Sequence, residues 1–269
     1  MKTTLLSMLF SSMLLLLSCS ERVYQSSTPK VSSLKIMTYN IHHANPPSEA
    51  GKIDLAAIEK VIRDQKPDLV ALQEVDVNTL RSGMVNQAST LAINLGMNFL
   101  FAKAIDHDGG EYGVVILSKY RLSDNQVHKL PTKEGTNGEP RVLATVQVNL
   151  PGNQKLRFGC THLDALKDDT NRLLQVEAIN GIAAQEELPF IIAGDLNARP
   201  GSPVIKLFDQ QFTRSCSDCA FTIPTGKPTA AIDFVAFSRK HNMEVLKHEV
   251  VQEHYASDHL PVVTLLKLK

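Results

Sequence analysis

The sequence has no tryptophan, and only 6% of its 269 residues are aromatic. A row of exposed rings on which nucleic-acid bases could stack is therefore not visible. An excess of charge of one sign is also absent, because 28 Lys and Arg residues balance 28 Asp and Glu residues. This balance argues against a strongly basic protein that binds nucleic acid non-specifically, although it leaves room for a local basic groove.

Long hydrophobic runs are scarce as well. The apolar run over residues 5–17 is shorter than the roughly 20 residues that span a bilayer, but its length suits a signal peptide. It ends in Leu16-Leu17-Ser18-Cys19, which resembles a bacterial lipobox. We therefore predict a signal peptide over residues 1–18 and an exported lipoprotein, periplasmic or on the cell surface, anchored in the membrane through a lipid on Cys19. The alternative is an ordinary signal peptide that contains a cysteine.

Cysteine is also rare, with four residues in the chain. Cys160 lies in an apolar strand pattern and is predicted to be a buried thiol. Cys216 and Cys219 have CxxC spacing, but no second pair of ligands suggests a zinc site. Export favours a disulfide between these two cysteines, and two free thiols are the alternative.

After a polar tether over residues 19–33, the chain shows no linker, repeat or low-complexity tract, so residues 34–269 are predicted to form one domain. Helical periodicity predicts helices over residues 53–65, 86–95 and 169–185. Apolar runs predict strands over residues 34–39, 68–73, 114–117, 142–149, 156–160, 190–193, 233–237 and 261–268. Helices and strands that do not alternate strictly indicate an α/β sandwich with mixed sheets.

Polar residues follow the apolar strands again and again. Asn40, Glu74, His162 and Asp195 each come directly after such a run, and Asp258-His259 precedes the last strand. One instance is explained by the preference of Asp and Asn for turns. Together they indicate one site at one edge of the sandwich. An oxygen-rich set of this kind suits Mg²⁺ (or Mn²⁺) and not structural zinc.

Seven short motifs in order carry a family resemblance. They are Tyr39-Asn40-Ile41, Leu72-Gln73-Glu74-Val75-Asp76, Gly110-Glu111-Tyr112-Gly113, Thr161-His162-Leu163, Gly194-Asp195-Leu196-Asn197, Ile232-Asp233-Phe234 and Ser257-Asp258-His259. Over residues 34–266 the chain resembles the endonuclease/exonuclease/phosphatase superfamily. The resemblance implies a four-layer α/β/β/α sandwich of two mixed sheets flanked by helices. It also implies a metal-dependent phosphoric ester hydrolase of the EC 3.1 class.

The resemblance further implies roles for single residues. Glu74 is expected to be the principal metal ligand, with Asn40 and Asp258 near the ion or its waters. Asp195 is expected to orient or deprotonate the attacking water, and Asn197 to hold that water or the phosphate. His162 and His259 are expected to donate hydrogen bonds to phosphate oxygens, with Asp233 paired to His259.

Residues on the substrate side are less constrained by the motifs. Tyr112, Arg81 and Arg141 are candidates for binding the substrate phosphate, while a structural turn tyrosine and two structural ion pairs are the alternatives. His42 and His43 adjoin Asn40, and one of them could reach the cleft, although a surface or supporting place is favoured. Val114 stands where related sequences often carry Asn, and the CxxC pair lies where no family cysteine is expected.

The sequence is compatible with three functions. The first is a phosphodiesterase or phosphatase acting by water attack on phosphorus, on a small phosphoester or a phospholipid or sugar-phosphate head group. The second is a secreted or surface nuclease cleaving DNA or RNA, and the third is a non-catalytic binding module on the same fold. Neutral charge and the predicted lipid anchor favour the first, and the chain is assumed to act as a monomer.

Overall fold

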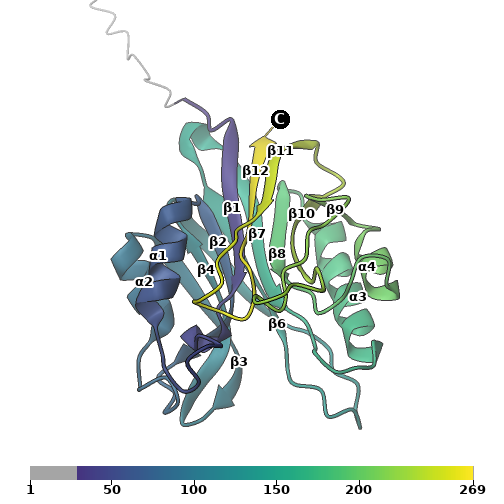
Figure 1. Ribbon diagram of the computed structural model, residues 1–269. Helices are drawn as coiled ribbons and strands as arrows, with labels where there is room; N and C mark the ends of the chain where they lie inside the picture. The colour runs from purple at the N-terminus through teal and green to yellow at the C-terminus, as the bar shows by residue number, and fades with distance from the viewer. Residues whose placement is uncertain (1–28, 269) are drawn as a thin grey trace, which may run out of the picture.

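Two six-stranded β-sheets packed face to face form the centre of the molecule (Figure 1). The computed structural model describes residues 29–268; the predicted signal peptide and Cys19 lie outside them. Helices cover the two outer faces, so the layers run α/β/β/α, as predicted from the sequence. No helix within residues 29–268 is long and apolar enough to cross a membrane.

The first sheet joins both ends of the described chain. Its strand order is β11-β12-β1-β2-β4-β3. The strands are β1 (Ser33–Asn40), β2 (Leu69–Val77), β3 (Asn98–His107), β4 (Gly110–Ser118), β11 (Met243–Val250) and β12 (Val262–Leu268). Only β1 and β2 are parallel neighbours. Because β12 runs antiparallel to β1, the chain enters β1 and leaves β12 at the same end of the sandwich.

The second sheet has the strand order β5-β6-β7-β8-β10-β9. Its strands are β5 (Arg121–Lys129), β6 (Val142–Asn149), β7 (Lys155–His162), β8 (Phe190–Asp195), β9 (Phe212–Arg214) and β10 (Asp233–Ser238). Here β7 and β8 are the parallel pair. Parallel neighbours end at the same edge, and this places the ends of β7 and β8 side by side.

Helices and an apolar layer between the sheets hold this arrangement together. Helices α1 (Leu55–Gln65) and α2 (Gln87–Leu95) pack on the first sheet. Helices α3 (Thr170–Gln185) and α4 (Pro203–Phe208) pack on the second, and two short 3₁₀ turns, η1 (His42–Ala44) and η2 (Pro151–Asn153), complete the order. Central strands are buried on both faces, which explains why they read as continuous apolar runs in the sequence.

Local capping explains where the predicted helices begin and end. Asp54 accepts a hydrogen bond from the backbone N–H of Ala57 at the start of α1, and Asn86 caps α2 in the same way. Gly96 ends α2 in the left-handed conformation, with φ of +64°. The three predicted helices therefore agree with the structure to within a few residues.

Two predictions about cysteine are confirmed. Cys216 and Cys219 form a disulfide in the loop between β9 and β10. Cys160 is a fully buried free thiol in the layer between the sheets, where burial raises its pKa to about 12. A thiol with such a raised pKa is a poor nucleophile, so Cys160 serves packing.

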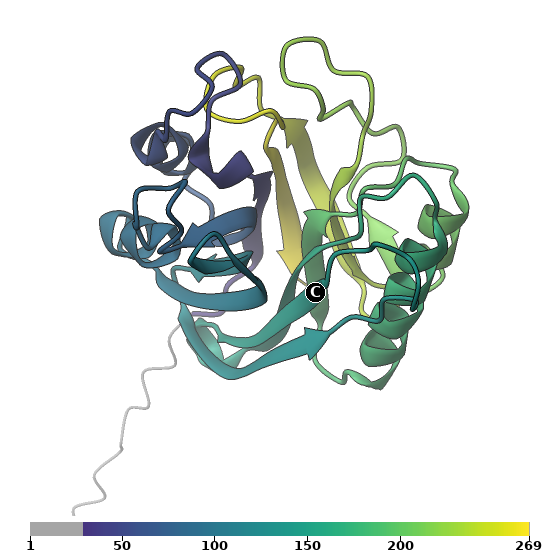
Figure 2. The ribbon, with the colours of Figure 1, turned by 90° about the horizontal axis from the view of Figure 1, so that it is seen from below.

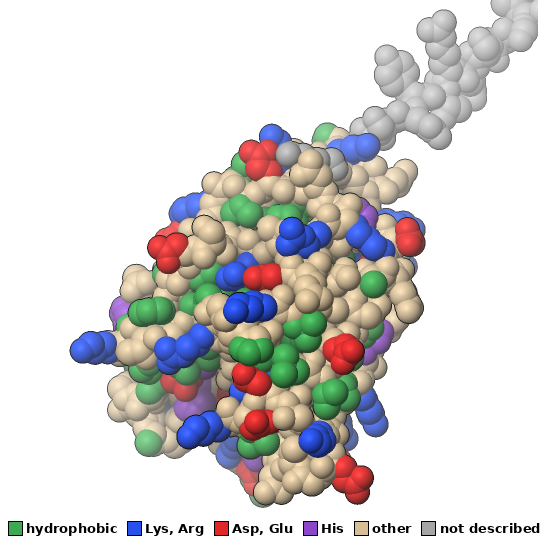
Figure 3. All heavy atoms as spheres, turned by 90° about the vertical axis from the view of Figure 1, so that its right-hand side faces the viewer, with side chains coloured by type: hydrophobic (Ala, Val, Ile, Leu, Met, Phe, Trp, Pro, Cys, Tyr) green, Lys and Arg blue, Asp and Glu red, His purple; other side chains and the backbone are tan. Residues whose placement is uncertain are grey.

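The surface agrees with the neutral composition. Figure 3 shows the side of the molecule that carries α3 and α4. Lys and Arg side chains are interspersed there with Asp and Glu, and neither sign gathers into one patch. This side therefore offers no basic surface on which a nucleic-acid backbone could lie.

Close packing of β7 against β8 predicts a strong effect of one glycine. A Cβ added at Gly194 would lie 2.1 Å from the backbone oxygen of Thr161, its partner in the parallel register. We expect Gly194→Ala to lower the free energy of unfolding by more than about 2 kcal/mol, because backbone cannot move aside as a side chain can. Gly181→Ala, within α3 and with nothing within 4 Å of the new Cβ, should raise it by about 0.4–1 kcal/mol. Urea denaturation of both variants measures this; equal midpoints would contradict the packing argument.

Candidate active site

One end of the sandwich collects the predicted polar residues; it faces the viewer in Figure 2. Asn40, His162 and Asp195 are the last residues of β1, β7 and β8, and Asp233 is the first residue of the antiparallel β10. The register places His162 and Asp233 directly beside Asp195 on its two neighbouring strands. The sheet topology therefore assembles a site from residues far apart in the sequence.

Glu74 also lies at this site, but it is inside strand β2 and not after the end of the strand, as the sequence predicted. The strand that was expected to end at Gln73 continues to Val77. Its pairing with β4 shifts register between Leu72 and Val75, so Glu74 lies at a β-bulge, with φ of +57°. A bulge breaks the strict alternation of side chains along a strand. This allows Glu74 to remain half-buried at the site while its neighbours in the strand are buried.

The side chain of Asn40 connects the two carboxylates across the sheets. Its Nδ2 donates to Glu74 Oε1 at 3.0 Å and to Asp195 Oδ2 at 3.2 Å. Its Oδ1 accepts from the backbone N–H of His42 at 3.1 Å, which fixes the orientation of the amide. Burial alone would raise the pKa of Glu74, but the nearby His43 ring and the hydrogen bond from Asn40 hold that pKa below its usual range. Glu74 is therefore an anion at neutral pH.

Asp195 lies at the centre of the site and is 1% exposed. Its Oδ1 accepts from the backbone N–H of Asn197 at 2.8 Å, and its Oδ2 lies 3.6 Å from His162 Nε2 and 3.8 Å from His259 Nε2. Burial and then repulsion from Asp233 raise the pKa of Asp195 to about 7, although the nearby His259 opposes the rise. A carboxylate with a pKa near neutrality is suited to accept a proton from water.

His259 and Asp233 form the pair that the sequence predicted. His259 Nδ1 lies 2.9 Å from Asp233 Oδ2, and Thr222 Oγ1 donates to the same oxygen at 2.5 Å. Burial alone would lower the pKa of His259, but the charge and hydrogen bond of Asp233 raise it to about 10. His259 is therefore an imidazolium at neutral pH. Its Nε2–H lies on the Asp195 side.

His162 differs from His259 in its charge. It is buried, and Arg141 Nη1 lies 3.3 Å from its Nδ1. Burial and the positive charge of Arg141 lower the pKa of His162 well below its usual value. Because the guanidinium can only donate, the ring proton of this neutral imidazole sits on Nε2. His162 can therefore donate a hydrogen bond at the site, as expected from the sequence, but it does so without a positive charge.

Asn197 and Asp258 frame the site. Asn197 Nδ2 donates to the backbone oxygen of Leu163 at 3.0 Å, which ties the loop after β8 to the end of β7. Ser257 Oγ lies 2.7 Å from the backbone oxygen of Asn40 and 3.4 Å from Asp258 Oδ1. This places Asp258 beside the end of β1, and its role as a metal ligand stays a prediction.

The substrate-side candidates lie next to Glu74. Arg81 donates from Nε and Nη2 to the buried Asp76, at 2.7 and 2.8 Å, and its guanidinium lies 5.6 Å from the ring centre of Tyr112. Arg141 pairs with Glu139 at 2.9 Å. Both structural ion pairs considered from the sequence are thus present. A cavity of about 100 Å³ is nevertheless lined by Glu74, Arg81, Ile105, His107, Tyr112 and Glu139.

Two groups of metal-ligating side chains gather at this end of the described chain: Asp195 with Asp233 and His259, and Glu74 with His42 and His43. In the first group the hydrogen bond between Asp233 and His259 already uses the ring nitrogen that faces Asp233. We therefore interpret the first group as a hydrogen-bonded relay and the second as the candidate metal site. The sequence favoured a surface or supporting place for His42 and His43, and it missed that both approach Glu74.

The match with known sequences covers this whole arrangement. Residues 37–259 match the sequence model of the Endonuclease/Exonuclease/phosphatase family. The chain belongs to this family. Members of the family are phosphoesterases and nucleases that typically depend on a divalent metal.

Solved structures of other family proteins share the fold. A Beutenbergia cavernae family protein is 24% identical, with a TM-score of 0.71, over 88% of this chain and 72% of that one. A mannosyl-6-phosphatase from Bacteroides thetaiotaomicron is 18% identical, with a TM-score of 0.71, over 87% and 99% of the two chains. The catalytic domain of human Nocturnin, solved with a bound sulfate, is 19% identical, with a TM-score of 0.69, over 90% and 96%. At these identities the likeness shows the fold alone.

The residues around Glu74 fit the divalent metal that is typical of the family. Glu74 offers an ionised carboxylate beside a cavity. His43 Nδ1 is buried, has no hydrogen-bond partner within residues 29–268 and lies 3.9 Å from Glu74 Oε2. Asn40 presents its amide nitrogen, not its oxygen, to Glu74. In this structure it positions the carboxylate, and its own role as a ligand stays a prediction.

The contrast between the two buried histidines can be measured in the metal-free protein. We expect His259 to titrate near pH 10 and to lose at least about one pKa unit in Asp233→Asn, since the opposing charge is removed. The pair stabilises the fold fully below about pH 6.5, the unperturbed value, and this contribution is lost as pH rises through about 10. Imidazole ¹⁵N shifts followed against pH provide the measurement. The signal of His128, which lies on β5, serves as the control and should be the same in the unsubstituted protein and in Asp233→Asn. A His259 that titrates near 6.5 would contradict the assignment.

Proposed function

We propose that this family member is a divalent-metal-dependent phosphoester hydrolase that activates water for attack on phosphorus. The observation that carries the proposal is the hydrogen-bonded unit Glu74–Asn40–Asp195. It sets an ionised carboxylate for a metal beside a buried carboxylate whose pKa is near neutrality. Such a pair places the charge that stabilises a phosphoryl group next to the group that accepts a proton.

Each residue of the site has a part in this reaction. Glu74 would hold the metal with help from Asn40 and Asp258, and the bound metal would supply positive charge against the developing charge of the phosphoryl oxygens. Asp195 accepts a proton from the attacking water while the new P–O bond forms. The ester P–O bond breaks with its electron pair on the alcohol oxygen, which takes a proton from solvent and leaves as the alcohol. His162 and His259 donate from Nε2 to phosphoryl oxygens. The imidazolium of His259 makes the stronger, charge-assisted bond.

A small phosphoester is the substrate class that the site supports best. The cavity beside Glu74 measures about 100 Å³ and offers Arg81 and Tyr112 to a phosphate or a sugar hydroxyl. The formal net charge is zero, and the side that carries α3 and α4 has no basic patch. The mannosyl-6-phosphatase, which shares the fold, acts on a phosphorylated sugar and makes sugar phosphates the first class to test.

A panel of phosphoesters tests the proposed function. The purified protein is incubated with Mg²⁺ or Mn²⁺ and a sugar phosphate, a phosphodiester, phospholipid vesicles or plasmid DNA. We expect the small esters to release phosphate and the plasmid to remain intact. Cleavage of the plasmid DNA at a higher rate would favour the nuclease hypothesis. Failure to turn over any substrate with either metal would favour the non-catalytic module.

The central carboxylate should govern the chemical step. We expect Asp195→Asn to lower kcat by at least about a hundredfold, because the amide keeps the shape but cannot take a proton from water. His259→Ala should cost a similar factor. The double variant should be much less than multiplicatively worse if the two groups act as one unit.

Asp64→Asn provides the matched control for Asp195→Asn. Asp64 is an exposed carboxylate of α1 that pairs with Lys60, so its substitution should leave kcat in place. All variants are compared by circular dichroism. A folded Asp195→Asn enzyme with more than half of the original kcat would refute the role given to Asp195.

We also propose that the enzyme is exported and anchored through a lipid on Cys19. The short apolar run that ends at this cysteine supports the proposal. Metabolic labelling with a fatty acid should mark the unsubstituted protein and not Cys19→Ala. Equal labelling of the two proteins would reject the anchor.

A further inference from the structure

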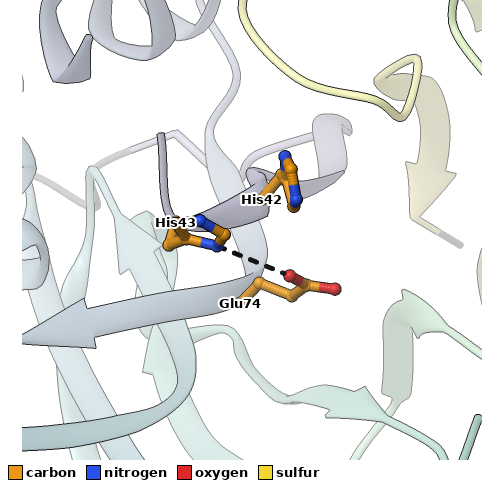
Figure 4. A group of neighbouring side chains, drawn as sticks. All are labelled: His42, His43 and Glu74. Carbon is orange, nitrogen blue, oxygen red and sulfur yellow. Dashed lines mark ion pairs between the residues drawn. The ribbon is translucent and has the colours of Figure 1, made fainter. Parts of the chain in front are cut away.

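We infer that His42 and His43 are metal ligands that join Glu74, so that this site binds a transition metal such as Mn²⁺ through imidazole nitrogen in addition to carboxylate oxygen. The inference rests on the proposed function, because it concerns the metal of that same site. It goes beyond that function in naming nitrogen ligands that the seven sequence motifs do not contain. Figure 4 shows the three side chains, with the dashed line from His43 to Glu74.

The three ligand-type atoms are close together. Those of His42, His43 and Glu74 all lie within 4.8 Å of one another. A metal held at about 2.1 Å from each ligand atom would bring such atoms within about 4.2 Å of one another. Small movements of the two rings are therefore enough to reach one shared ion.

The hydrogen bonding of His42 leaves one ring nitrogen available to an ion. His42 Nδ1 lies 2.9 Å from the backbone oxygen of Asn45. A carbonyl oxygen can only accept, so the proton of this ring sits on Nδ1 and the lone pair of a neutral imidazole on Nε2. Metal-ligating histidines typically donate their other ring N–H to a carbonyl or carboxylate in this way.

His43 has a buried nitrogen that needs a partner. Its Nδ1 has no hydrogen-bond partner within residues 29–268, and Glu74 Oε2 lies 3.9 Å away, beyond hydrogen-bonding distance. Leaving a buried polar group unsatisfied destabilises the folded protein. A cation between the ring and the carboxylate would satisfy both groups at once.

The backbone that carries the two rings is held in an unusual conformation. His42, His43 and Ala44 all have positive φ, at +47°, +43° and +62°. Residues other than glycine rarely adopt this region because it is strained for them. The turn is anchored through Gln87, which donates to the backbone oxygen of His43 and accepts from the backbone N–H of Asp76. The strained turn and the bulge at Glu74 are thus fixed to the same helix residue.

The chemistry of the ligand atoms determines which metal ion the two histidines would bind more tightly. Mg²⁺ prefers oxygen ligands, whereas transition metals accept imidazole readily. Losing the two rings should therefore raise the Kd for Mn²⁺ by at least about tenfold, the scale on which metal-site substitutions act. The Kd for Mg²⁺ should change by less than about threefold, because that ion would rely on oxygen atoms.

Pulsed electron paramagnetic resonance of Mn²⁺ on the metal-free, full-length protein tests the inference without any substrate. We expect ¹⁴N coupling from directly bound imidazole in the unsubstituted protein and in His128→Ala, a control on β5. We expect its loss in the His42→Ala/His43→Ala double variant. Calorimetry with Mn²⁺ and Mg²⁺ then gives the two affinities. His43→Gln, which retains a polar side chain at this position, replaces the double variant if that protein does not fold, and it should weaken the coupling.

Two outcomes would overturn the inference. One is bound Mn²⁺ without ¹⁴N coupling in the unsubstituted protein, and the other is full coupling in the folded double variant, which would assign the nitrogen to another histidine. These results are separate from the fate of the proposed function. An active hydrolase without nitrogen coupling rejects only the ligands, whereas an inactive protein with the coupling rejects only the hydrolase.

Discussion

The amide of Asn40 is the interaction on which the site depends. It belongs to the first sheet and holds Glu74 of the same sheet, and it also reaches Asp195 of the second sheet. Because its oxygen is fixed by the backbone of His42, the amide cannot turn away without losing a third hydrogen bond. The distance between the two carboxylates is thereby set by the packing of the two sheets. A change in how the two sheets pack would therefore change the distance between Glu74 and Asp195.

Near this amide, the negative charges of two buried carboxylates are offset by the positive charge of a histidine. Asp195 and Asp233 are both buried, and the imidazolium of His259 lies between them. Two buried carboxylates would otherwise repel each other and resist ionisation. On the other side, burial and the charge of Arg141 lower the pKa of His162 and keep that ring neutral. Asp195 thus lies beside two histidines of different charge: His259, charged because of Asp233, and His162, neutral because of its burial and Arg141.

Much of this could be predicted from the sequence, and the omissions have a common cause. Every predicted strand lies inside a sheet or next to its edge, whereas the four strands that were missed, β3, β5, β9 and β11, are the four edges. Edge strands such as β5 are largely exposed and carry polar residues, so they lack the apolar run of a central strand. The second sheet also ends in β9, which spans only Phe212–Arg214. Strands as short as this give little periodicity to detect.

The site shows the same division. Asp195, His162 and Asp233 could be placed because strand ends follow from apolar runs, and the motifs gave their order. The bulge at Glu74 and the positive φ of His42 and His43 could not be predicted, because no glycine stands at these positions to signal a left-handed backbone. The approach of His43 to Glu74 depends on contacts through Gln87 that are distant in the sequence. Tertiary packing, and not local preference, fixes these residues.

The antiparallel pairing of β1 with β12 has a consequence for how the enzyme can be mounted. Both ends of the described chain lie at one pole, and the candidate active site lies at the other, roughly 25 Å away along the eight residues of β1. A lipid at the predicted anchor, a purification tag after Lys269 or a coupling to a sensor chip would each attach the molecule at the pole opposite the candidate active site. Substrate would then arrive from the free solution opposite the support, without having to pass the attachment.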